Sequence, residues 1–129
     1  FGIKKGRMIK VMTDLQKERL EGLGVNIEET MERFVENEAL YFRCLNKLQD
    51  DKNFSLMCDA IEEGTDAGKA FDAAHALKGV SANLGLNKLF NELRVITEVF
   101  RAGSMDYDTD NLERLKAAYS EAINTIQTL

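Results

Sequence analysis

The chain contains no proline and no tryptophan among its 129 residues, and it has only one histidine. Because proline is the strongest helix breaker, its absence fits a chain made mostly of long helices. Runs of β-branched residues are also missing, so no segment predicts a strand. No apolar stretch approaches the ~20 residues that a membrane-spanning helix needs. These absences predict a soluble all-α protein that does not enter a membrane.

Few side chains in this sequence are suited to holding a metal. Its two cysteines, Cys44 and Cys58, lack the paired C-x-x-C spacing of zinc sites. Each lies on an apolar helical stripe, which predicts buried free thiols. The acidic residues are scattered without the paired carboxylate motif of a di-iron bundle. A glycine-rich phosphate loop is also missing, which argues against ATP binding. We therefore expect no metal and no cofactor.

The formal net charge of −5 disfavours nucleic-acid binding, which usually needs a basic face. The chain length suits one domain with a single core. Residues 1–10 are basic, begin without methionine, and lack the apolar run and cleavage site of a signal peptide. We assign residues 1–7 to an upstream or added segment and residues 8–129 to a single helical-bundle domain.

Apolar residues recur at intervals of three and four throughout the chain, which is the pattern of amphipathic helices. Asn37 is a candidate N-cap, and Gly64, Gly85 and Gly103 are candidate helix ends. The short loops favour antiparallel neighbours, so we predict an antiparallel up-and-down four-helix bundle with an additional N-terminal helical segment. The expected helices span residues 8–21, 27–35, 38–48, 54–63, 66–84 and 86–102, with a last helix from within 106–110 to about 128.

The only histidine, His75, lies in the helix expected over residues 66–84. A wheel drawn at ~100° per residue places His75 roughly 130° from the centre of the apolar face, near the solvent side. Gly79 follows one turn later, although glycine inside a helix costs up to about 1 kcal/mol relative to alanine. The residues predicted to form the core face of this helix are Ala67, Ala70, Ala74, Leu77, Ser81 and Leu84.

The neighbours of His75 at helical spacing are mostly small. Because Gly68, Gly79 and Ala82 leave the surface bare, another molecule can approach the imidazole closely. Lys78 adds a cation that would stabilise an anionic group on the ring. A neutral imidazole keeps a nitrogen lone pair and can form covalent intermediates. This pattern predicts a nucleophilic histidine that accepts a group such as phosphoryl, with any metal or nucleotide supplied by a partner.

The run His75-Ala-Leu-Lys78-Gly79-Val-Ser81-Ala-Asn-Leu84-Gly85 closely resembles the HxxKGxSxxLG signature of histidine-containing phosphotransfer (HPt) domains of two-component phosphorelays. The resemblance covers residues 27–129 and includes Phe71 and the segment 34–41. It implies a cytoplasmic, bacterial, monomeric phosphocarrier that is not an enzyme. His75 would accept a phosphoryl group from a receiver-domain aspartate and pass it to another receiver domain.

The same resemblance implies that Lys78 assists the phosphoryl group and that Gly79 clears the docking surface. It also implies response-regulator receiver domains and a hybrid histidine kinase as partners, with any Mg²⁺ on the receiver. Two alternatives remain open: a helical module that docks receiver-like partners without phosphotransfer, and a dimerising kinase fragment. The residues that we expect at the docking surface are Gly68, Phe71, Asp72, Gly79 and Ala82.

Overall fold

The computed structural model describes residues 12–129, and every regular element in that range is a helix. This confirms the all-α prediction. Within the same range, no helix combines the length and apolar character that crossing a membrane requires. The helices are α2 (Asp14–Glu21), α3 (Ile27–Arg33), α4 (Glu38–Lys47), the 3₁₀-helix η1 (Leu48–Asp50), α5 (Asn53–Glu63), α6 (Ala67–Leu84), α7 (Asn87–Arg101) and α8 (Thr109–Thr128).

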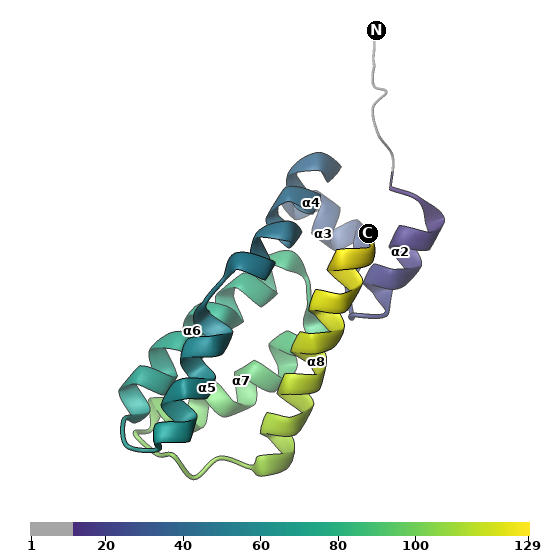
Figure 1. Cartoon of the computed structure of the whole chain (residues 1–129). Coiled ribbons are helices and arrows are strands. Elements are labelled where there is room, and N and C mark those ends of the chain that lie inside the picture. The colour runs from purple at the N-terminus through teal and green to yellow at the C-terminus, as the bar shows by residue number, and fades with distance from the viewer. Residues whose placement is uncertain (1–11) are drawn as a thin grey trace, which may run out of the picture.

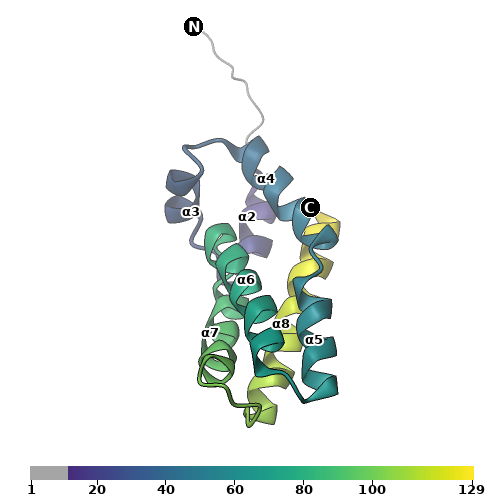
Figure 2. The same cartoon turned by 90° about the vertical axis from the view of Figure 1, so that its left-hand side faces the viewer.

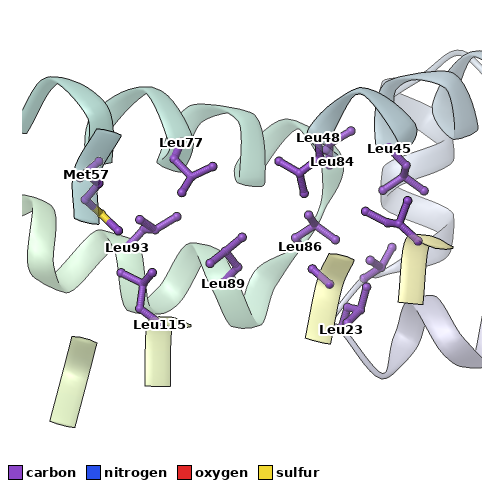
Figure 3. Close-up of a cluster of buried hydrophobic side chains, with 14 of the residues drawn as sticks. Leu23, Leu45, Leu48, Met57, Leu77, Leu84, Leu86, Leu89, Leu93 and Leu115 are labelled. Carbon is purple, nitrogen blue, oxygen red and sulfur yellow. The ribbon is translucent and has the colours of Figure 1, made fainter. Parts of the chain in front are cut away.

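Four antiparallel rods form the predicted bundle. One rod consists of α4 and α5, which run end to end through η1, and the others are α6, α7 and α8 (Figure 1). The short helices α2 and α3 lie together at one end of the bundle (Figure 2). Leucines from α4, η1, α6 and α7 meet in the interior with Met57 of α5 and Leu115 of α8 (Figure 3). The predicted four-helix bundle with an added N-terminal segment is confirmed.

The predicted helix over residues 8–21 is not continuous, because residues 12 and 13 are not helical. Helix α2 begins at Asp14, after a capping box in which the Thr13 hydroxyl accepts a hydrogen bond from the Gln16 amide at 3.0 Å. The Thr13 amide donates in return to the Gln16 side chain at 2.9 Å. Residues 8–11, where the helix was expected to start, and the proposed upstream segment 1–7 lie outside the described residues.

Helix α3 ends earlier than the predicted boundary at residue 35. Val35 and Glu36 adopt left-handed backbone angles, with φ of 55° and 59°, and the Val35 side chain is 84% exposed. The Glu36 amide donates to the carbonyl of Met31 at 2.7 Å, which closes the turn after α3. Asn37 then caps α4 as predicted, because its side chain accepts from the Leu40 amide at 2.9 Å.

Both ends of α6 are fixed by the residues that the sequence indicated. The Asp66 carboxylate accepts from the Lys69 amide at 3.1 Å and caps the N-terminus. Gly85 adopts the left-handed region with φ of 75°, and the Leu86 amide donates to Ser81 in a Schellman motif. A Cβ atom at Gly85 would lie 2.6 Å from the Thr30 hydroxyl of α3, so packing also requires glycine here.

The buried face of α6 matches the helical wheel with two exceptions. Ala67 is only half-buried because it is the first residue of the helix, at the rim of the bundle. Ala73, which the wheel left out, is buried in contact with the core. Cys44 and Cys58 are free thiols as predicted, but both are half-buried rather than buried. The residues of α6 that are buried are Ala70, Ala73, Ala74, Leu77, Ser81 and Leu84.

Tyr41 connects α4 to the end of α6 through a buried hydrogen bond. Its hydroxyl donates to the carbonyl of Leu84 at 2.8 Å, and burial raises the pKa of the phenol. We expect Tyr41→Phe to lower the free energy of unfolding by about 1–2 kcal/mol, because the buried Leu84 carbonyl loses its donor. Urea denaturation at neutral pH measures this change. Tyr107→Phe is the control, since the Tyr107 ring is half-buried and packs edge-on against Phe100.

The raised pKa of Tyr41 also predicts how stability depends on alkaline pH. The folded protein holds the phenolic proton more tightly than the unfolded chain, so stability should fall as pH rises beyond about 10, the ordinary pKa of tyrosine. Tyr41→Phe should weaken this dependence. Equal alkaline slopes for the wild type and the variant would contradict the assignment.

Candidate functional site

His75 lies midway along α6 with its side chain exposed, as the wheel predicts. The helix is capped at both ends and buries its opposite face in the core, so the backbone that carries the imidazole is rigid. None of the hydrogen bonds and ion pairs among residues 12–129 involves the imidazole. Its nitrogen atoms are therefore available to a second molecule.

The imidazole makes one aromatic contact. The ring of Phe71, one turn earlier in α6, stacks on His75 with 5.1 Å between centroids and 13° between planes. On Phe71 in turn lies the guanidinium of Arg101 from α7, with Cζ 4.8 Å from the ring centroid. The Nε atom of Arg101 contacts a carboxylate oxygen of Glu98 at 3.1 Å. The three side chains therefore form a stack that joins α6 to α7.

The surface around His75 is as bare as the sequence indicated. A Cβ atom added at Gly79 would meet nothing within 4 Å, so no neighbouring group requires glycine at this position. At Gly68 the same atom would lie 3.2 Å from the Asp66 carboxylate. Gly68 and Gly79 are both exposed, and Ala82 is half-buried. An approaching surface can therefore reach the imidazole along the length of α6.

The charged groups near His75 differ in sign. Lys78 is half-buried one turn after His75, and the guanidinium of Arg101 lies over the ring of Phe71, one turn before His75. Asp72 is exposed three residues before His75. The predicted site residues of α6 thus lie along one surface of the bundle, where Phe71 packs against the imidazole. Among residues 12–129, no three His, Cys, Asp or Glu side chains gather as a metal ion would require.

Arg101 is the neighbour of this site that sequence reasoning missed. A signal for it was present, because α6 and α7 form a hairpin around Gly85 and Leu86. Phe71 and Arg101 lie equally far along the chain from Leu86, and residues equidistant from such a turn face each other across an antiparallel pair. Counting outward from the predicted turn would have placed the arginine beside the histidine helix.

Comparison with known families gives one result. A family model described as the Hpt domain matches residues 27–125. No curated protein and no solved structure matches the chain significantly. The matched range begins at α3 and ends within α8, so it contains three rods of the bundle in full, most of the fourth, and the whole surface around His75. Helix α2 lies outside it.

Proposed function

The chain belongs to the Hpt domain family, and from this premise we propose that it is a phosphocarrier whose phosphoacceptor is His75. Hpt domains take part in histidine phosphotransfer within phosphorelays, where they interact with receiver domains and act as carriers rather than kinases. The observation that carries the assignment is the exposed imidazole of His75 on a rigid helix, beside a glycine that no packing contact requires.

The proposed step is an exchange of one phosphorus bond for another. The unprotonated ring nitrogen of His75 attacks the phosphorus of a receiver aspartyl phosphate. The bond between phosphorus and the aspartate oxygen breaks, and the carboxylate leaves with that electron pair. The other ring nitrogen keeps its proton, so no oxidant or further reactant is needed. The reverse exchange passes the group to a second receiver, and any Mg²⁺ would belong to the receiver.

Lys78 is proposed to stabilise the charge of the phosphoryl group from one turn away. Lys78→Gln should slow uptake about tenfold, since salt partly screens the charge of a half-buried lysine that solvent still reaches. Rapid-quench measurement of label transfer at saturating receiver gives the rate. Lys69→Gln is the matched control, because it removes the same charge from α6 where the side chain pairs with Glu63. Equal losses in the two variants would mean that only the overall charge of the helix matters.

The docking surface is proposed to follow the small and polar residues of α6 on either side of His75. Gly68 and Gly79 would let the receiver backbone come close, and Ala82 would extend the contact toward the end of the helix. Asp72 is exposed and can pair with a cation of the partner. The partners that fit this surface are response-regulator receiver domains, one of them within a hybrid histidine kinase.

The deciding experiment follows labelled phosphate from a phosphorylated receiver domain to this protein. We expect the label on the protein to be labile in acid and stable in base, as a phosphorus–nitrogen bond should be, and to move on to a second receiver. A module that only docks would bind the receivers and take no label. If no receiver of its own genome delivers label to the wild type, the carrier assignment is wrong.

The oligomeric state separates the carrier from a kinase fragment. A dimerising kinase domain should elute as a dimer in size-exclusion chromatography, whereas the proposed carrier should elute as a monomer. We also propose that the protein acts in the cytoplasm, where the receivers of two-component systems are found.

A further inference from the structure

The stack of Arg101, Phe71 and His75 suggests a role for Phe71 beyond the docking surface. We propose that Phe71, held by Arg101, is a positioning residue that fixes the imidazole of His75 with both ring nitrogens directed outward for phosphoryl transfer. This inference rests on the proposed carrier function. It assigns the aromatic side chain to the orientation of the nucleophile, and it assigns Arg101 a part in that orientation from a different helix.

Helix geometry explains why Phe71 is suited to this role. Side chains of an α-helix lean toward the N-terminus, so a residue comes to rest over the side chain four positions earlier. His75 therefore leans onto Phe71, and the two rings are stacked nearly parallel, with 13° between their planes and 5.1 Å between their centroids. The lone pair on the unprotonated nitrogen of an imidazole lies in the plane of the ring. Stacking covers one face of His75 and leaves the edge with both nitrogens open.

The contact matters because an exposed imidazole has few other restraints. The terminal torsion of a histidine side chain is broad, so an unsupported ring samples many orientations. Phe71 is half-buried and packs against the core, which makes it a firm support. A nucleophile held near its reactive orientation reacts faster than one that must find this orientation in each encounter.

Arg101 restrains Phe71, the aromatic partner of His75 in the stack. Its guanidinium lies 4.8 Å from the Phe71 centroid, within the range of a cation–π contact. The ion pair with Glu98, one turn earlier in α7, restrains the arginine in turn. The orientation of the phosphoacceptor is therefore linked to the pairing of α6 with α7, and the receiver need not impose it.

The first test is spectroscopic and needs no phosphate. Two-dimensional NMR of the imidazole should show ring protons of His75 shifted upfield by the aromatic ring in the wild type. In Phe71→Leu these shifts should be lost and the side-chain couplings should become averaged. Phe71→Tyr should restore both. Phe54→Leu is the matched control, because Phe54 stacks on Tyr119 at another helix interface, and its loss should leave the His75 signals unchanged.

The second test separates orientation from docking. Phe71→Leu should lower the transfer rate at saturating receiver on the order of tenfold, with little change in the receiver concentration that gives half the maximal rate. A purely docking residue would change mainly that concentration, and such a result would overturn the proposal. Unchanged His75 signals in Phe71→Leu would overturn it as well.

Arg101→Gln tests the link to α7. The proposal expects partial averaging of the His75 signals together with a smaller loss of rate than in Phe71→Leu. If Arg101→Gln slows transfer and leaves the His75 signals intact, the arginine acts on the phosphoryl group itself and its assigned role is wrong. If the wild type accepts no label at all, the carrier function fails, while the NMR comparison still decides whether Phe71 orients the ring.

Discussion

His75→Gln should abolish phosphoryl uptake from a phosphorylated receiver domain. Glutamine resembles histidine in size and polarity, but its amide nitrogen has no available lone pair and cannot form the phosphorus–nitrogen bond. His75 is the only histidine of the chain, so no other imidazole can take over. Because the side chain is exposed, the free energy of unfolding should change by no more than about 0.5 kcal/mol.

The measurement compares labelled wild type, His75→Gln and Ala76→Gln after mixing with the same phosphorylated receiver. Ala76 is the adjacent exposed position of α6, so Ala76→Gln places an equal side chain beside an intact imidazole and should retain uptake. Acid-labile label on His75→Gln would show that another residue is the acceptor. Receiver binding by His75→Gln, measured by calorimetry, should persist, which separates a lost nucleophile from a lost docking surface.

The elements that the sequence predicted well are those with local signals at their ends. Asp66, Asn37 and Gly85 each stop or start a helix through a bond between near neighbours, and each lies where it was expected. The exposure of His75 follows from the same local logic, since the period of the apolar residues decides which face of α6 is buried. Such features need no knowledge of the rest of the fold.

The features that were missed depend on contacts between distant segments or on weaker local patterns. Val35 and Glu36 adopt left-handed backbone angles although neither is glycine. Since β-branched residues such as valine rarely adopt positive φ, no signal in the sequence indicated this turn. Arg101 reaches Phe71 only once α6 and α7 pair. The capping box at Thr13 was a local signal, with glutamine three residues later, that the longer apolar pattern concealed.

The sequence alone predicted only part of the functional site. The helical wheel shows a lone imidazole on a bare surface, and it says nothing about which group that imidazole would carry. Only the motif around His75 and the family match indicate that this group is a phosphoryl group. The orientation of the ring by Phe71 could be learned only from the structure, because i,i+4 spacing allows stacking without requiring it.

The second large prediction concerns Gly79. A role in docking and a role in helix packing predict opposite changes in stability when a side chain is added at this position. An added Cβ atom would meet nothing within 4 Å, and glycine in a helix interior costs up to about 1 kcal/mol relative to alanine. Gly79→Ala should therefore raise the free energy of unfolding by about 0.5–1 kcal/mol. If Gly79 instead served helix packing, the same change would destabilise the protein.

Gly79→Phe should keep the fold and weaken receiver binding about 100-fold, because one large side chain next to His75 prevents close approach and leaves neighbouring contacts unmade. Calorimetric titration with a receiver domain measures the loss, and thermal unfolding confirms the fold. Ala76→Phe is the control, since it places the same ring on α6 about 100° further round the helix from His75. Receiver binding that survives Gly79→Phe unchanged would mean that the partner does not approach over this glycine. If Gly79→Phe is stably folded and no longer binds the receiver, the helix gives up stability at Gly79 to keep the imidazole accessible.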